Sequence, residues 1–102
     1  MSPAEFVARR ERGDDLVLLD VREPWELEIA SVPGIVHIPM DQIPDRIGEL
    51  DPAREIVVLC RVGGRSLQVA RWLEVQGFAT VANLSGGILA WARDVDPSLP
   101  VY

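Results

Sequence analysis

The sequence predicts a single small α/β domain, with a mainly parallel sheet of four to five strands and helices on both faces. Short continuous apolar runs, such as residues 16–19 and 56–60, are typical of strands that are buried on both faces. Segments with apolar side chains every three or four residues, typical of amphipathic helices, separate these runs. Regular alternation of the two patterns predicts right-handed crossovers between parallel strands.

The first half of the chain opens with a helix-start signal. Ser2 can cap a helix, Pro3 suits the first helical position and Glu5 completes a capping box. Pro44 is tolerated only in the first turn of a helix, which places the start of a later helix near Gln42. The elements expected in this half are a helix over 2–12, a strand over 16–19, a short helix over 25–30, a strand over 35–38 and a helix over 42–50.

The second half contains the strongest predicted strand, residues 55–59, which is β-branched and apolar at its centre. A helix should follow over 65–76, with Leu67, Ala70 and Leu73 on its apolar side, and Gly77 should end it. A last strand is expected over 80–84, and Ser85-Gly86-Gly87 leads into a helix with Ile88, Trp91, Ala92 and Val95 on one face.

Composition excludes several classes of function. The 102 residues suffice for one domain, which we expect to span residues 1–102, and the formal net charge of −6 argues against a nucleic-acid binder. The longest apolar run is too short to span a membrane, and the N-terminus lacks a secretory pattern. One cysteine and one histidine can form neither a disulfide framework nor a Cys/His metal cage. We expect a cytoplasmic protein that uses no metal or cofactor.

The only cysteine, Cys60, stands at the end of the strongest strand and before a turn into a helix. In open α/β sheets, ligands bind beyond the carboxyl ends of the strands. Gly63 and Gly64 would let backbone N–H groups point inward, and the helix N-terminus, Arg61 and Arg65 would add positive charge. Each effect favours the thiolate, so we expect a reactive sulfur in a pocket that opens to water. Such a site suits sulfur transfer, attack on a phosphate or arsenate group, or simple binding of an anion or partner.

These residues resemble a known family. The segment 60–66, Cys-Arg-Val-Gly-Gly-Arg-Ser, resembles the active-site loop of the rhodanese family, and 18–24, Leu-Leu-Asp-Val-Arg-Glu-Pro, is similar to that family's segment after its first strand. Further likeness lies at 32–39 and 84–91, so the resemblance runs over the whole chain. The C-terminal part resembles most the rhodanese domains of adenylyltransferases that activate sulfur carrier proteins.

The resemblance implies a rhodanese-type sulfurtransferase in which Cys60 forms a persulfide. The donor would be a small molecule such as thiosulfate, and the acceptor cyanide, an external thiol or a sulfur-carrier protein. The loop residues would bind the substrate, with Arg65 anchoring the loop and Arg61 exposed; these residues are Arg61, Val62, Gly63, Gly64, Arg65 and Ser66. Val62 replaces the family's usual serine, so a hydroxyl that could contact the outer sulfur is absent. Ala30-Ser31-Val32 replaces the usual Gly-His-Ile, which we expect to matter little for catalysis.

Two counts refine the mechanism. Four residues separate Cys60 from Arg65, one fewer than in the pattern of cysteine phosphatases, and the shorter loop favours sulfur over phosphorus. No second thiol in the chain can receive the sulfur, so the acceptor must be external and the reaction should be ping-pong. An arsenate reductase or phosphatase of related fold, and a non-catalytic rhodanese-like binding module, remain as alternatives.

Other polar and aromatic residues have simpler interpretations. Asp20 and Arg22, at the end of a buried strand, should pair with each other or support the Cys60 loop from beneath, rather than take part in the chemistry directly. His37 should be a hydrogen-bonded structural imidazole rather than a catalytic base. Trp72 and Trp91 fall on helical apolar stripes and should belong to the core, whereas Trp25 should border the site or cover the sheet edge.

Overall fold

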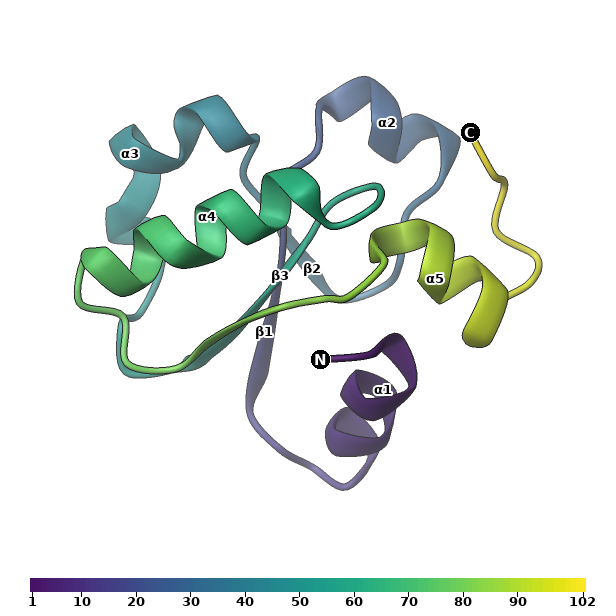
Figure 1. The fold of residues 1–102 in the computed structure, drawn as a ribbon, viewed down its shortest axis with the longest axis horizontal. Coiled ribbons are helices and arrows are strands. Elements are labelled where there is room, and N and C mark those ends of the chain that lie inside the picture. Colours follow the sequence, from purple (N-terminus) through teal and green to yellow (C-terminus); the bar gives the residue numbers. More distant parts are fainter.

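A computed structural model describes residues 1–102 of the chain as one four-stranded sheet with helices on both faces. The strands are β1 (Leu16–Asp20), β2 (Ile35–His37), β3 (Glu55–Leu59) and β4 (Val81–Asn83), and they lie in the order β2-β1-β3-β4. All three pairings are parallel. The carboxyl ends of all strands therefore meet at one edge of the sheet, where Figure 1 also shows the loop that connects β3 to the next helix.

Five α-helices connect or flank the strands, as the sequence predicts: α1 (Pro3–Glu11), α2 (Pro24–Ile29), α3 (Ile43–Arg46), α4 (Gly64–Val75) and α5 (Gly87–Asp94). The cap at Ser2 is confirmed, because its hydroxyl oxygen accepts a hydrogen bond from the Glu5 backbone N–H at 3.1 Å. Helices α3 and α4 cover one face of the sheet, and α1 and α5 cover the other (Figure 1).

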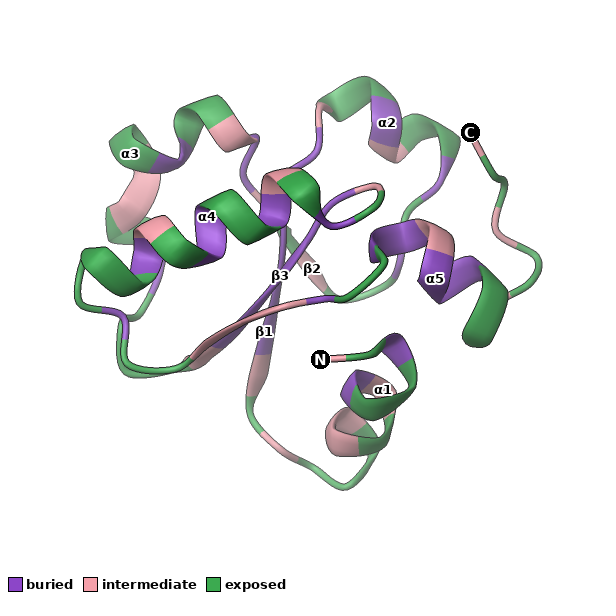
Figure 2. Ribbon diagram, in the orientation of Figure 1, coloured by how far each residue is buried: buried purple, intermediate pink, exposed green.

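The core consists of two apolar layers, one on each side of the sheet (Figure 2). Alternate residues of β3 supply them: Ile56 and Val58 point to the α3–α4 side, whereas Val57 and Leu59 point to the α1–α5 side. All four side chains are completely buried. This double burial explains why the strand is a continuous apolar run rather than an alternating one.

Two predicted details are wrong. The expected helix over 42–50 is only the four-residue α3, with 3-10 turns at Met40–Gln42 and Ile47–Glu49. Gly48 explains this, since glycine lowers the stability of a longer α-helix, whereas Pro44 lies in the first turn, where proline is tolerated. In addition, Leu67 is not on the buried side of α4. The buried residues are Ser66, Val69, Ala70 and Leu73, a stripe spaced i, i+3, i+4, i+7, and Leu67 lies one residue away from it.

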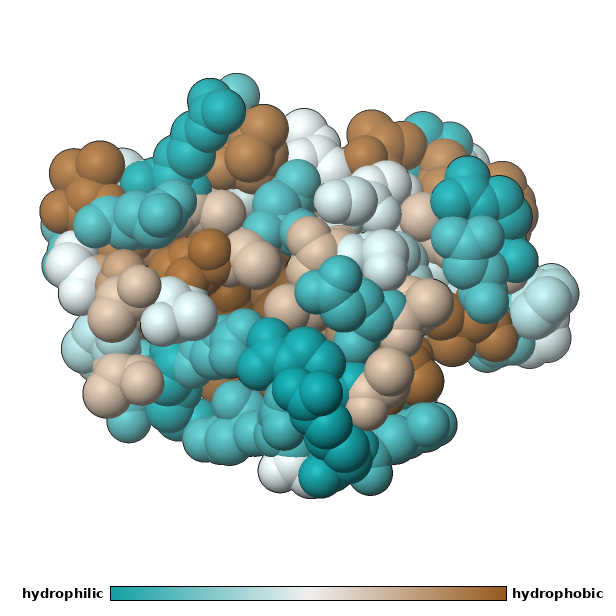
Figure 3. Space-filling view, turned by 60° about the horizontal axis from the view of Figure 1, so that its bottom comes forward, coloured by the Kyte–Doolittle hydropathy of each residue, from teal (hydrophilic) through white to brown (hydrophobic).

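Polar side chains dominate much of the outer surface. On the face in Figure 3, hydrophilic side chains form a broad band and hydrophobic ones are exposed in separate areas. No helix has both the length and the apolar character that crossing a bilayer requires.

Candidate functional site

Cys60 directly follows β3, and a short turn leads from it into α4. Gly63 precedes the helix with φ +111°, a left-handed conformation that side chains other than glycine rarely adopt. Gly64, which we expected to share this freedom, has no positive φ and is simply the first helical residue. One glycine therefore turns the backbone so that the N–H groups of the turn face the cysteine.

The Cys60 sulfur accepts hydrogen bonds from this turn. The Gly63 N–H donates to it at 3.1 Å, and the Ser66 hydroxyl oxygen lies 3.2 Å away. Burial by itself raises the pKa of the thiol. Hydrogen bonds from the Ser66 hydroxyl and from the N–H groups of Ser66, Gly63 and Val62 outweigh burial, so the pKa of Cys60 is lowered from its ordinary value.

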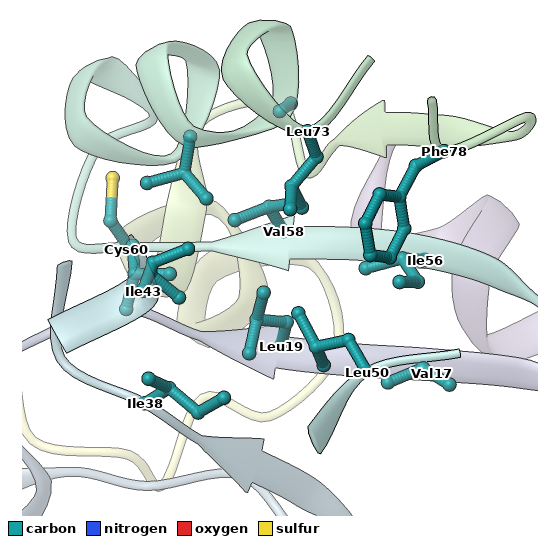
Figure 4. Close-up of a cluster of buried hydrophobic side chains, with 13 residues drawn as sticks. Val17, Leu19, Ile38, Ile43, Leu50, Ile56, Val58, Cys60, Leu73 and Phe78 are labelled. Atoms are coloured by element: carbon teal, nitrogen blue, oxygen red, sulfur yellow. The ribbon is translucent and has the colours of Figure 1, made fainter. Parts of the chain in front are cut away.

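The expectation that this sulfur opens to water is wrong for this structure, because Cys60 is only 1% exposed. It belongs to the apolar layer beneath α4, and Figure 4 shows it at the end of that row of side chains, with its sulfur directed toward the helix. A hollow of about 270 Å³ lies nearby but Cys60 does not line it; its walls are Met40, Ile43, Pro44, Gln68, Val69 and Trp72. The surroundings of Cys60 therefore favour the thiolate, but neighbouring residues cover the sulfur.

The last helix holds the Cys60 turn from outside. The Ile88 N–H donates to the Cys60 carbonyl at 2.9 Å, and the Leu89 N–H donates to the Arg61 carbonyl at 3.2 Å. A Cβ on Gly87, whose φ is +60°, would lie 2.4 Å from the Arg61 carbonyl oxygen and 2.5 Å from that of Cys60. We expected Gly86-Gly87 only at a helix start, and this contact was missed, although the glycine pair was a signal for it.

Arg65 ties the first turn of α4 to α2. Its guanidinium binds the Glu26 carboxylate with two bonds, at 2.7 and 2.8 Å, and the Glu26 side chain is only 3% exposed. The Arg65 bond is the main reason why the pKa of Glu26 falls from 4.5 to about 2. Arg65 therefore lies where an anchor of the loop should be. Its partner Glu26 was missed, since no spacing in the sequence links the two residues.

Asp20 and Arg22 form a second, fully buried ion pair, with 2.8 Å between the Arg22 Nη2 and the Asp20 Oδ2. The pairing that we considered between them is thus confirmed. Arg22 also donates to the Tyr102 hydroxyl at 2.8 Å, and that hydroxyl donates to the Glu26 carboxylate at 2.9 Å. The pair reaches the Arg65 anchor of α4 through this chain of contacts.

Arg61 is not freely exposed, contrary to expectation. It is half-buried, its guanidinium donates to the Tyr102 carbonyl oxygen, and it lies 5.1 Å from the centre of the Tyr102 ring. The tail of the chain folds back to the loop and covers this arginine. Nothing in the sequence pattern indicated a contact for Tyr102.

The remaining candidates lie around this site or in the core. Trp25 is 58% exposed and its ring packs edge-on against Tyr102, so it lies beside the C-terminal tail. The His37 Nε2 is 2.7 Å from the Arg22 carbonyl oxygen, which confirms a structural hydrogen bond. Trp91 is buried in the apolar layer on the α1–α5 side, and Trp72 packs, partly buried, against the layer on the α3–α4 side, so both contribute to the core as predicted.

Comparison with known proteins relates this geometry to a family. Residues 2–94 match the family described as Rhodanese-like domain. "Putative sulfurtransferase YtwF" of Bacillus subtilis (strain 168) is 40% identical over 97 residues, which are 95% of this chain and 93% of that protein. "Rhodanese-like/PpiC domain-containing protein 12, chloroplastic" of Arabidopsis thaliana is 52% identical over 93 residues, and there this chain spans 31% of the relative's length.

Two further relatives agree. "Adenylyltransferase and sulfurtransferase MOCS3-1" of Zea mays is 33% identical over 105 residues, which cover 96% of this chain and 22% of the relative. The solved structure of a rhodanese-like domain protein from Staphylococcus aureus has a TM-score of 0.86 at 27% identity and covers 100% of this chain and 96% of its own. The family match, these relatives and the cysteine turn between β3 and α4 lead to one conclusion: this chain belongs to the rhodanese-like family.

Proposed function

We propose that this protein is a sulfurtransferase that carries a sulfane sulfur on Cys60 as a persulfide. The observation that carries the proposal is the set of hydrogen bonds that the Cys60 sulfur accepts from Gly63 and Ser66, with the lowered pKa that results. A thiolate is the nucleophile that sulfur transfer requires. Relatives that carry the name sulfurtransferase support the same activity.

The first half-reaction loads the enzyme. The Cys60 thiolate attacks the outer sulfur of thiosulfate, the bond between the two thiosulfate sulfurs breaks, and sulfite leaves with that electron pair. Charge is conserved, because a thiolate and a thiosulfate dianion give a persulfide anion and a sulfite dianion. Backbone N–H groups of residues 61–66 would stabilise the charge on the new outer sulfur. Cys60 is only 1% exposed, so residues that cover the sulfur must move before thiosulfate can reach it.

The second half-reaction removes the outer sulfur from Cys60. A thiolate or cyanide attacks the outer sulfur, and Cys60 leaves as a thiolate again. The chain has one cysteine, so the acceptor comes from outside and the rate law should be ping-pong. We propose a small thiol or a sulfur-carrier protein as the cellular acceptor, because relatives include a "Putative sulfur carrier protein YrkF" from Bacillus subtilis and adenylyltransferase-sulfurtransferases. A reducing compartment such as the cytoplasm suits an unpaired thiol.

The functional unit in this proposal is one domain over residues 1–102. The tail belongs to it, because Tyr102 contacts both Arg22 and Arg61 beside the cysteine turn. Arg65 would anchor the loop through Glu26, and Asp20 and Arg22 would support it from beneath.

Intact mass measured after incubation with thiosulfate tests the proposal. We expect a gain of one sulfur atom that cyanide removes, with thiocyanate released. The C60S variant should gain none and lose at least about 10⁴-fold in thiocyanate formation. Its near-isosteric change makes it a matched control, provided that its circular dichroism and unfolding curve equal those of the wild type.

The same samples separate the alternatives. Turnover of a phosphate ester or of arsenate that depends on Cys60 would replace the proposal with a phosphatase or arsenate reductase. A mass that stays unchanged with thiosulfate and with a second donor, such as a small organic persulfide, would indicate a binding module and contradict sulfur transfer.

A further inference from the structure

The Ser66 hydroxyl has two hydrogen-bonding neighbours and only one proton. Its oxygen lies 3.2 Å from the Cys60 sulfur, and it is also hydrogen-bonded to the Asn83 side-chain oxygen Oδ1. Ser66 is completely buried, so water does not supply a third partner. A serine hydroxyl can donate one hydrogen bond and accept two, so it can donate to the sulfur or to the amide but not to both.

The orientation of the Asn83 amide follows from its other contact. Its Nδ2 donates to the Gly63 carbonyl oxygen at 3.1 Å. A carbonyl can only accept, so the NH₂ group must face Gly63 and Oδ1 must face Ser66. Asn83 is the last residue of β4, and its backbone is held by the strand pairing with Val58. The acceptor beside Ser66 is therefore fixed in place.

The two protonation states of Cys60 then make different demands on this hydroxyl. With a thiol, every group is satisfied if the S–H donates to Ser66 and Ser66 donates to Asn83. With a thiolate, the sulfur has no proton, and Ser66 must turn away from Asn83 to donate to the anion. A charged acceptor attracts a donor more strongly than a neutral one, but the turn leaves Oδ1 without its partner.

We propose that Asn83 is a positioning residue for the chemistry of Cys60, because its Oδ1 competes with the sulfur for the single proton of Ser66. This inference rests on the proposed function of Cys60 and deepens it. In the persulfide the negative charge lies on the outer sulfur, so Ser66 donates to Asn83. When an acceptor takes the outer sulfur, the charge returns to the Cys60 sulfur, and the hydroxyl turns to stabilise that leaving thiolate.

The second contact of Asn83, with the Gly63 carbonyl, supports the turn that follows Cys60. By donating to the Gly63 carbonyl, Asn83 braces the residue whose N–H donates to the sulfur at 3.1 Å. Loss of Asn83 therefore has two separable effects, a freed Ser66 hydroxyl and a looser Gly63. The first acts only through Ser66, whereas the second does not depend on that hydroxyl.

Charged groups around the cysteine turn also affect the pKa of Cys60, so they must stay unchanged when Asn83 is substituted. Arg65, on α4, is the cation with a direct electrostatic interaction with Cys60. The other charged groups at this edge come from the turn itself, from the end of β1 and the segment after it, from α2 and from the N-terminus, whose ammonium donates to the Asn83 carbonyl at 3.0 Å: Arg61, Asp20, Arg22, Glu26 and Met1. A neutral substitution at position 83 alters none of them, so a shift in the titration of Cys60 reports on hydrogen bonds.

The test is a double-mutant cycle with N83L and S66A on the full chain. The readout is the apparent pKa of Cys60 from the pH dependence of its alkylation by iodoacetamide, a measurement that needs no sulfur donor. S66A should raise this pKa. Relative to its effect in the S66A background, N83L in the wild-type background should lower the pKa by roughly half a unit to one unit, the size of one hydrogen bond.

Equal shifts of the pKa by N83L in both backgrounds would overturn the proposal, because Asn83 would then act on the turn without Ser66. If N83L does not fold, N83A repeats the cycle. Failure of sulfur loading with a preserved coupling would refute the proposed function alone.

Discussion

Two neighbouring turns at the carboxyl edge of the sheet are built alike but used differently. One leads from β3 into α4 through Gly63, and the other leads from β4 into α5 through Gly86. Both glycines have a left-handed backbone, with φ +111° and +78°, and neither helix has a side-chain cap. In each turn, the first N–H groups of the helix have no acceptor within the helix, and they lie at the same edge of the sheet.

The difference lies in what accepts those N–H groups. In the first turn, the Cys60 sulfur accepts from Gly63. In the second, the Cys60 and Arg61 carbonyls accept from Ile88 and Leu89. The N-terminus of α4 can therefore interact with the Cys60 sulfur, whereas the N-terminus of α5 binds the backbone of the cysteine turn and holds it in place. Positive charge at a helix start is useful to a reaction only when the backbone that presents it is held.

The largest expected effect comes from breaking this division at Gly87. A Cβ there would lie 2.4 Å from the Arg61 carbonyl oxygen, so G87A should destabilise the fold by at least about 3 kcal/mol. The matched control is G64A in the first turn, where a Cβ meets nothing within 4 Å and φ is not positive. It should change stability by less than about 1 kcal/mol, in the stabilising direction. Urea unfolding of both variants measures this, and similar losses would show that the turns do not differ as described.

A medium effect should follow from removing the side-chain anchor, which only the first turn has. The Glu26 pKa is lowered from 4.5 to about 2, so its pairing with Arg65 contributes stability above pH 4.5 that is lost as the pH falls toward 2. E26Q should lower the free energy of unfolding at neutral pH by about 2 kcal/mol and flatten its dependence on pH in that window. Urea unfolding across this range measures both.

The control for this prediction is D15N. Asp15 pairs with Arg54 at the surface, where its side chain is 71% exposed. Such a pair contributes little, so the loss should be within about 0.5 kcal/mol. If E26Q costs no more than D15N, the contact between α2 and α4 is not an anchor.

The smallest effect concerns the tip of the first turn. Val62 is 55% exposed, so V62S should leave the free energy of unfolding unchanged within about 0.5 kcal/mol. Its hydroxyl would add a donor for the outer sulfur, and we expect the rate of loading by thiosulfate to rise roughly 2- to 10-fold. Stopped reactions analysed by intact mass give that rate. A slower reaction would indicate that the apolar tip itself assists the donor.

The order of helices and strands was predictable because strands that are buried on both faces are continuous apolar runs in the sequence. Residues 56–59 are apolar without interruption since the sheet is covered on both sides. Leu67 was misplaced because several apolar stripes can be drawn on one helix, and only packing selects among them. The prediction of an extended helix over 42–50 was wrong for a similar reason, because its apolar spacing did not reveal the effect of Gly48.

The site was predictable where one segment contains it. Cys60, Gly63 and Ser66 act on one another within seven residues, and a turn of that length leaves little choice. Glu26, Asn83 and Tyr102 contact this segment from elsewhere in the chain and are joined to it only by the fold. The burial of the sulfur was not predictable either, since it depends on how α4 and the neighbouring core close over it.

The contact between Gly87 and the cysteine turn also has a consequence for biosynthesis. A ribosome that has just passed β3 has already incorporated Cys60, but the donors for the Cys60 and Arg61 carbonyls lie almost thirty residues further along the chain. The reactive turn can therefore take its final shape only after α5 has emerged. Nascent chains arrested before residue 87 should lack the hydrogen bonds that α5 donates to the cysteine turn, and we expect the pKa of their Cys60 thiol to be that of an ordinary cysteine.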